Sequence, residues 1–271
     1  MKHLSKLFLI FAVTAGLAFL QSCEKESFLQ EASTDILADV ELKNADGTRT
    51  FYGPATSIGK GVARAWVKED ANGNPVEVGL DLTEKALENL PHEMANFVLP
   101  FHKNKGKHFY DHVYLGWGPM GHEPPGVYDL PHFDVHFYIT TSAEREAIGF
   151  SPFSVPVDPK YAPPAYLLAD PVVPQMGSHW IDLLAPELDP ASGKIFEHVY
   201  ILGSHEGEFI FWEPMITLDF LLSKPNITVP VRQPSEWQRD GWYATAYRVK
   251  YSDKPGTYTI ALTGLTWRSG S

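Results

Sequence analysis

Prolines and glycines are spread along this chain so evenly that short strands joined by turns are favoured over long helices. There are 22 prolines and 21 glycines in 271 residues, and both residue types mark turns and end regular elements. The runs between them predict about nine to eleven strands and two short helices, with no alternation of strand and helix and no internal repeat. We therefore expect a mainly β protein, either an antiparallel β-sandwich or a barrel, with one or two short helices.

Two predicted hairpins support this prediction. The extended runs within residues 61–83 flank Asn72 and Gly73, and Asn-Gly is a strong hairpin-turn signal. Near the C-terminus, two alternating runs meet at a turn predicted over residues 253–256. Such alternation places every second side chain on the same face of a strand.

The two helices are predicted from capping residues and apolar spacing. The first begins after Thr83 and is ended by Pro91. The second begins at Ser142, where Glu144 or Arg145 would complete a capping box.

The N-terminal residues predict export and a lipid anchor. Lys2 and Lys6 precede an apolar run from Leu7 to Leu20, which is typical of a signal peptide and too short for an ordinary membrane-spanning helix. Cys23 directly follows Leu-Gln-Ser, a pattern that resembles the bacterial lipobox, in which the cysteine becomes the lipidated first residue. The alternative is a plain secretory peptide with an incidental cysteine.

These segments predict both a domain organisation and a location. We expect a lipoprotein signal peptide over residues 1–22, a lipid-anchored tether over 23–50 and a single β-rich domain over 51–271. The protein would belong to the cell envelope, at the outer membrane or facing the periplasm, and would touch the membrane only through the lipid on Cys23.

Charge and motif content exclude several classes of function. The formal net charge of −11 lacks the basic footprint that nucleic-acid binding needs. The one cysteine has no partner for a disulfide and, once lipidated, none remains for thiol chemistry. The sequence contains no phosphate loop, dinucleotide fingerprint or serine-nucleophile elbow, so neither nucleotide binding nor serine catalysis is predicted. A homo-oligomer is compatible with these features.

The stretch PHFDVHFYI, residues 131–139, places His132, Asp134 and His136 on one face of a strand. Residues two apart lie about 6.6 Å apart along a strand, so Asp134 can share a metal ion with either histidine. His132 and His136 lie about 13 Å apart in a regular strand, and share an ion only if a bulge or the Pro131 turn bends the chain. The alternative is a solvent-facing polar stripe.

Three residues elsewhere are candidates to complete such a site. His179 lies in a glycine-containing turn, and His122 lies in a Gly/Pro loop that leads into the 131–139 strand. Glu213 stands in an apolar run, where a carboxylate is costly unless it is paired or bound to a cation. For His122 the alternative is an ordinary surface position. For Glu213 it is a buried ion pair with one of three arginines, Arg145, Arg232 or Arg248.

We therefore predict a divalent metal site with His136, His179 and Glu213 as the core ligands. His132 or His122 would complete the shell, with Asp134 beside them. Nitrogen and oxygen ligands without thiolate suit Zn, Mn, Fe or Ni.

The same stretches resemble a bacterial domain family of unknown function that is found mostly in exported proteins and lipoproteins. The matching pieces, spread from about residue 53 to 222, are GKGVARAWVKEDANGNPVEVGLDLTEKALENLP, GHEPPGVYDLPHFDVHFYI, MGSHWID and EPMIT. The resemblance implies a β-rich fold and places His122, His132, Asp134, His136, His179 and Glu213 in one set of motif residues. It implies no activity.

Three functions fit these observations. The first is a lipid-anchored metal-binding domain, and the second is a metal-dependent hydrolase with Asp134 or Glu123 as general base. The third is a binding module for glycans or another envelope component. Its stacking platforms would be tryptophans: Trp66, Trp117, Trp180, Trp212, Trp237 and Trp242.

Overall fold

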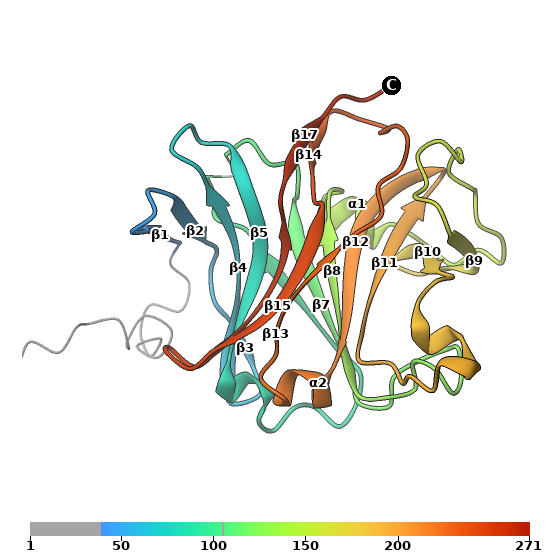
Figure 1. Cartoon of the computed structure of the whole chain (residues 1–271), viewed down its shortest axis with the longest axis horizontal. Coiled ribbons are helices and arrows are strands. Elements are labelled where there is room, and N and C mark those ends of the chain that lie inside the picture. The colour runs from blue at the N-terminus through green and yellow to red at the C-terminus, as the bar shows by residue number, and fades with distance from the viewer. Residues whose placement is uncertain (1–38, 105) are drawn as a thin grey trace, which may run out of the picture.

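Two large antiparallel sheets form the protein, as Figure 1 shows. The structure is a computed structural model that describes residues 39–104 and 106–271. The predicted signal peptide, Cys23 and the first part of the predicted tether lie outside these residues. No helix among the described residues is long and apolar enough to cross a membrane.

The first sheet has the strand order β1-β2-β4-β5-β16-β15-β13, and β3 also pairs with β4. The predicted hairpins lie in it, since β4 pairs with β5 and β15 pairs with β16. Its strands are β1 (Val40–Lys43), β2 (Arg49–Tyr52), β3 (Thr56–Ile58), β4 (Gly61–Glu69), β5 (Pro75–Thr83), β13 (Asn226–Pro230), β15 (Ala246–Ser252) and β16 (Thr257–Thr263).

The second sheet has the order β6-β7-β8-β12-β11-β10-β9, and a separate small sheet pairs β14 with β17. The strand predicted over residues 131–139 is β8, which lies inside the second sheet between β7 and β12. The strands are β6 (Ala95–Pro100), β7 (His112–Gly118), β8 (His132–Tyr138), β9 (Tyr166–Val173), β10 (Gly177–Asp182), β11 (His198–His205), β12 (Glu208–Thr217), β14 (Gly241–Tyr243) and β17 (Thr266–Arg268).

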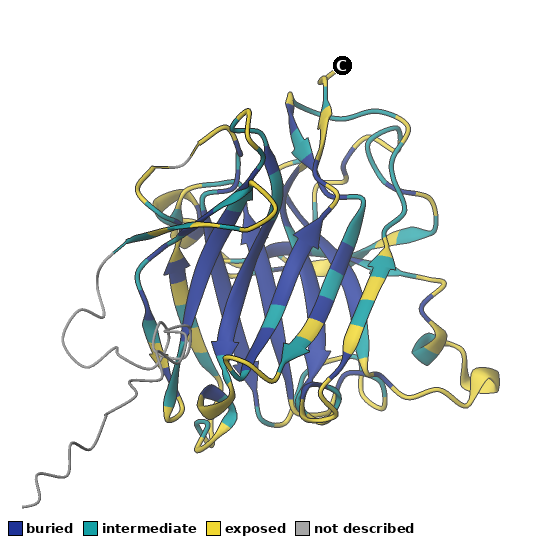
Figure 2. Cartoon of the chain, turned by 60° about the vertical axis from the view of Figure 1, so that its left-hand side comes forward, coloured by how far each residue is buried: buried dark blue, intermediate teal, exposed yellow. Residues whose placement is uncertain are grey.

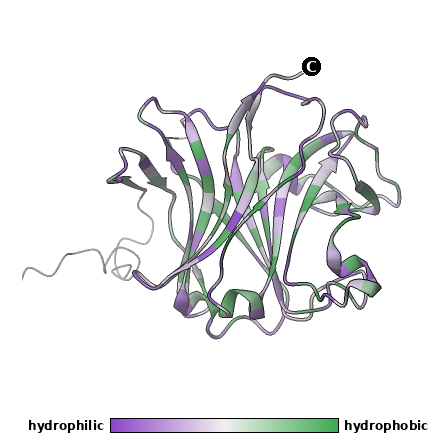
Figure 3. Ribbon diagram, in the orientation of Figure 1, coloured by the Kyte–Doolittle hydropathy of each residue, from purple (hydrophilic) through white to green (hydrophobic). Residues whose placement is uncertain are grey.

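The main hydrophobic core lies between the two large sheets. Val67 and Leu80 of the first sheet and Phe133, Val135 and Phe137 of the second belong to the same buried cluster. Figure 2 shows the central strands as a nearly continuous buried band, and Figure 3 shows hydrophobic and hydrophilic residues alternating along them. The protein is therefore mainly β, and of the two architectures predicted from the sequence it is the sandwich.

Strand β8 is buried on both of its faces. All seven of its residues are buried, so the solvent-facing stripe considered from the sequence is wrong for this strand. Two smaller apolar clusters cover the outer face of the second sheet, and they include Tyr128 and Ala185 from long connections and Ile148 after the first helix. His132, Asp134 and His136 consequently lie beneath a layer of loops.

The helices are short; the first begins after Thr83 as predicted but ends sooner, and the cap of the second shifts by one residue. Thr83 ends β5, and only one 3-10 turn follows it, because Glu88 is extended and Asn89 has a positive φ of 56°. At the second helix Thr141, not Ser142, is the cap, and it forms a capping box with Glu144. The elements are α1 (Ser142–Glu146), α2 (Leu218–Leu222) and the 3-10 turns η1 (Glu84–Leu87), η2 (Pro186–Leu188) and η3 (Pro190–Ser192).

The described sheet extends further toward the N-terminus than the boundary predicted at residue 51. Strand β1 pairs with β2, and β2 pairs with β4 through Arg49 to Tyr52. The described part of the predicted tether, residues 39–50, therefore contributes an edge to the first sheet. These two strands have four residues each, which leaves little alternation to recognise in the sequence.

Candidate metal centres

The candidate residues lie on the outer face of β8 because every second side chain of the strand packs into the main core. Phe133, Val135 and Phe137 point into the main core, so the side chains between them point to the opposite face. On the neighbouring β7, Gly116 lies opposite Asp134 and Gly118 opposite His132. A Cβ on Gly116 would stand only 3.2 Å from Asp134 Oδ2. Gly116 thus leaves the space that the Asp134 side chain occupies.

The first cluster consists of His122, His132 and Asp134, and we call it centre A. The Nε2 atom of His132 lies 2.9 Å from Asp134 Oδ1, and that of His122 lies 3.8 Å from the same oxygen. His122 reaches the strand from the 119–131 loop, where Gly121 has a φ of 65° and leaves no room for a Cβ beside Tyr128 O. Centre A therefore joins one loop residue to two strand residues.

The second cluster consists of His136, His179 and Glu213, and we call it centre B. The register of β12 against β8 pairs Trp212 with Phe137 and Met215 with Asp134, which sets Glu213 beside His136. His136 Nε2 lies 3.4 Å from Glu213 Oε1, and His179 Nε2 lies 3.9 Å from Glu213 Oε2. Two imidazoles therefore flank one buried carboxylate.

His179 reaches centre B across a glycine. It lies on β10, where it pairs with Gly203 of β11, while Glu213 lies one strand further on. A Cβ on Gly203 would come within 1.9 Å of the Phe211 ring, so only glycine lets that ring lie across β11. The ring of His179 packs against Phe211 with centroids 5.5 Å apart. The role of Gly203 was not predicted from the sequence, where its local signal is a glycine inside the strand HVYILGSH.

Backbone carbonyls orient three of the four histidines. The Nδ1 atoms of His122, His132 and His136 lie 2.7, 2.6 and 3.1 Å from carbonyl oxygens of Glu123, Leu130 and Tyr114. A carbonyl oxygen can only accept, so each Nδ1 carries a proton. The Nε2 atom then presents a lone pair when the ring is neutral and donates when the ring is protonated. Metal-binding histidines have this arrangement in proteins.

None of the three arginines considered from the sequence pairs with Glu213. Arg145 binds Glu146 and Gln175, Arg232 binds Asp182, and Arg248 binds Glu77. Within the described residues, Glu213 Oε2 and His136 Nε2 are buried without a hydrogen-bond partner. A buried carboxylate that faces the lone pair of His136 Nε2 needs either a proton or a cation.

The two carboxyl groups have opposite electrostatic environments. Burial raises the pKa of Glu213 well above its ordinary value, and the charge of Asp134 adds to the effect. Burial also opposes the ionisation of Asp134, but the neighbouring imidazoles of His122 and His132 outweigh it and hold the pKa of Asp134 well below the usual range. The environment of Asp134 thus favours the ionised carboxylate, whereas that of Glu213 favours the protonated carboxyl group.

The pKa values of the histidines also shift in opposite directions at the two centres. Burial lowers the pKa of His136 to about 4, and burial with the nearby His136 lowers the pKa of His179 to about 3. At His122 burial lowers the pKa, but the carboxylate of Asp134, 3.8 Å from Nε2, outweighs it, and the net shift is upward. The pKa shifts therefore favour neutral imidazoles at centre B and a protonated His122 at centre A.

Each cluster has the composition and spacing of a metal site. In each, three ligand atoms lie within 4.8 Å of one another. Zinc–nitrogen bonds of about 2.0–2.1 Å separate the ligands of a tetrahedral ion by about 3.4 Å, close to the 3.4 and 3.9 Å at centre B. Two histidines and one carboxylate also leave at least one coordination position free for water or another molecule.

The structure brings all six candidate residues to one face of one sheet, but in two groups of three. The sequence predicted one shell around His136, His179 and Glu213, completed by His132 or His122. Instead, His132 and His122 lie with Asp134 in a cluster of their own. The distance of about 13 Å expected between His132 and His136 accounts for the division, because β8 stays regular.

Comparison with known proteins gives one match. Residues 70–117, from the β4–β5 turn to β7, match a family described as TTHB210-like, hypothetical protein TTHB210. This stretch contains none of the six residues of centres A and B. No curated protein and no solved structure matches the chain. Over these residues the chain is similar to an uncharacterised protein family.

Proposed function

We propose that this protein is a lipid-anchored protein of the cell envelope that binds divalent transition-metal ions at centres A and B. Glu213 carries the proposal. Its carboxylate is 2% exposed, it has no arginine or lysine partner among the described residues, and the Nε2 atoms of His136 and His179 face it. A metal ion would satisfy all three groups at once.

The choice of metal follows from the ligand atoms. Both centres offer imidazole nitrogen and carboxylate oxygen and no thiolate, which suits Zn, Mn, Fe or Ni. The oriented Nδ1–H groups would fix the imidazoles and strengthen their binding.

The proposed location rests on the N-terminal residues. The signal-peptide pattern and the lipobox-like Leu-Gln-Ser-Cys support an anchor at Cys23, with the protein at the outer membrane or facing the periplasm. Labelling of the expressed protein with radioactive palmitate, compared with Cys23→Ala, tests this part separately. Equal labelling of the two proteins would contradict the anchor.

Elemental analysis of the purified protein tests the metal proposal. We expect bound transition metal in the wild type and a loss of about one ion per chain in Glu213→Gln. Asp81→Asn is the matched control: Asp81 is also a buried carboxylate, but it accepts hydrogen bonds from Tyr52, Trp66 and Thr259 in the other sheet. A metal-free wild type whose unfolding temperature does not change in a chelator would overturn the proposal.

A metal-dependent hydrolase is the second candidate, and the free coordination position favours it. Of the two residues considered as general base, Asp134 lies among the ligand atoms of centre A, whereas Glu123 is exposed beside His122. The candidate therefore predicts metal-dependent cleavage of chromogenic esters or phosphoesters that is lost in Glu123→Gln while bound metal is retained. Turnover unaffected by this substitution would remove Glu123 as the base.

The glycan-binding candidate loses half of its proposed platforms. Trp66, Trp117 and Trp180 are at most 6% exposed and belong to the core. Trp212, Trp237 and Trp242 are half-buried, and the first two line a common pocket.

A further inference from the structure

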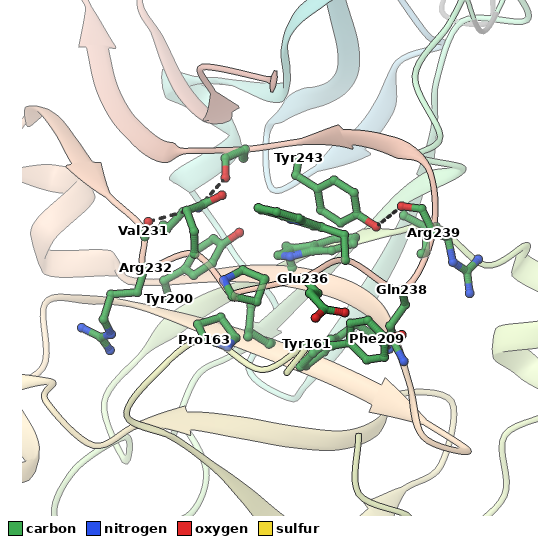
Figure 4. A pocket seen from close by; sticks show the side chains of 17 residues that line it. Tyr161, Pro163, Tyr200, Phe209, Val231, Arg232, Glu236, Gln238, Arg239 and Tyr243 are labelled. Carbon is green, nitrogen blue, oxygen red and sulfur yellow. Dashed lines mark hydrogen bonds between the residues drawn. The ribbon is translucent and has the colours of Figure 1, made fainter. Parts of the chain in front are cut away.

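A second site, on the other face of the sheet that carries centres A and B, has the features of a small-ligand pocket. Tyr200 and Leu202 of β11 and Phe209 and Trp212 of β12 form its floor, and residues 231–239 cover it (Figure 4). The floor residues belong to the main core or pack against it. The pocket therefore lies where the core of the sandwich reaches the surface.

The charged and amide groups around the pocket already have partners. Gln238 accepts from Phe209 N and donates to Gly207 O. Glu236 pairs with Lys160 and accepts from Ser271 Oγ. These contacts hold the 231–239 segment in place without using a ligand. A ligand would therefore meet mainly aromatic surface.

Tyr200 is the exception. Its side chain is 6% exposed, yet its hydroxyl has no hydrogen-bond partner among the described residues. In Figure 4 this hydroxyl points toward the middle of the pocket. The ring stacks on Tyr247 with centroids 5.4 Å apart, so the hydroxyl is held in position. A buried hydroxyl of this kind is a donor ready for an acceptor atom.

The size of the cavity limits what can enter. It measures about 40 Å³, and one water-sized sphere needs about 10–15 Å³. The space thus holds about three non-hydrogen atoms, which must be compact, largely apolar and include one acceptor. An acetyl group has these properties: a methyl group for the aromatic walls and a carbonyl oxygen for the hydroxyl.

We propose that this pocket binds the acetyl group of an N-acetylated ligand, with the Tyr200 hydroxyl donating to the carbonyl oxygen. The rest of the ligand would lie outside, against the half-buried Trp237 and the charged rim of Arg232 and Arg239. An amino sugar and an acetylated lysine share the acetamide group, and the rim is open to both. The site is separate from the metal centres, because none of its lining residues belongs to them.

Titration of the full chain with matched small probes tests the proposal. We expect saturable binding of N-acetylglucosamine, N-acetyl-lysine or both by calorimetry, and binding at least about tenfold weaker for glucosamine and lysine, which lack the acetyl group. A preference between the two acetylated probes identifies the source of the acetamide. Failure of both to bind, or equal affinity for the probes without the acetyl group, overturns the proposal.

Tyr200→Phe supplies the second arm, since it removes the hydroxyl and keeps the ring. We expect about a tenfold loss of affinity for the acetylated probe. Tyr128→Phe is the matched control, because Tyr128 also has a buried hydroxyl without a partner but lies outside the pocket. Removal of metal with a chelator should leave this affinity unchanged. Equal binding by wild type and Tyr200→Phe would overturn the role of the hydroxyl, and the probe comparison stands even if the variant does not fold.

Discussion

Centres A and B use the same three residue types on the same strand face, yet their chemistry differs. In centre A an ionised Asp134 lies between two histidines, and His122 is 35% exposed. In centre B a carboxyl group with a raised pKa lies between two neutral histidines, and Glu213 and His136 are almost fully buried. Charge and burial, more than ligand identity, therefore decide how each centre would compete for a cation.

The largest expected effect separates the two centres by mutation. His179→Ala removes one of three ligands of centre B and should weaken metal binding there by more than about 100-fold. His132→Ala should do the same at centre A, and each variant should keep the other centre. Titration calorimetry would show two sites in the wild type and one in each variant. His198→Ala, which removes a half-buried histidine bound to Tyr247, is the control, and loss of both sites in either ligand variant would show that the centres are not separate.

The pH dependence of binding should differ next most strongly. Proton loss from Glu213 must accompany binding at centre B, so its affinity should rise about tenfold per pH unit below the pKa of that group. Asp134 is already ionised, so centre A should level off once His122 has lost its proton. The two single-site variants allow each curve to be measured alone by calorimetry from pH 5 to 8. Parallel curves would contradict the opposite environments of the two carboxyl groups.

In the metal-free protein, Glu213 and Asp134 should have opposite effects on the free energy of unfolding. Because the pKa of Glu213 is raised in the folded protein, this residue lowers the free energy of unfolding as pH rises above the ordinary value of 4.5. Glu213→Gln should therefore stabilise the metal-free protein at pH 8. Because the pKa of Asp134 is lowered in the folded protein, this residue stabilises the fold above pH 3.8, and the stabilisation is lost as pH falls through the folded-state pKa. Asp134→Asn should therefore destabilise at pH 8, by about 1–3 kcal/mol. Urea unfolding measures both, and a shift of the same sign in the two variants would refute the expectation.

The smallest expected effects on metal binding come from the glycines that make room for the ligands. Gly203→Ala should displace Phe211 and weaken centre B, and Gly116→Ala should press on Asp134 and weaken centre A. Each should cost about 1–3 kcal/mol of unfolding free energy. Gly149→Ala is the control, since nothing lies within 4 Å of its added Cβ. Metal titration and thermal unfolding would check whether each glycine acts on its own centre.

Residue chemistry made centre B partly predictable from the sequence. A carboxylate within the apolar run FIFWEPMIT must have a partner, and this singles out Glu213 without any knowledge of the fold. Strand spacing likewise predicts that His132 and His136 cannot share an ion in a regular strand. Both arguments depend on local geometry and on the cost of burying charge, which a single segment displays.

The assembly of the centres was not predictable in the same way. That β12 pairs with β8, and that His179 crosses β11 over Gly203, depends on strand order, which no local pattern in one sequence encodes. The burial of β8 on both faces depends on loops that lie far away in the chain. The short strands β1, β3 and β17 have three or four residues each, too few for alternation to stand out from a loop.

The burial of β8 on both faces limits the insertions and deletions that the strand can accept. A two-residue insertion or deletion in the strand preserves which side chains face the core and which face the loops. A one-residue insertion exchanges them: beyond the insertion point, histidine and aspartate would enter the hydrophobic interior and phenylalanine and valine would take the places of the ligands. The interior and the metal centres would then be lost together. We expect insertions within β8 to be tolerated, if at all, only in even numbers.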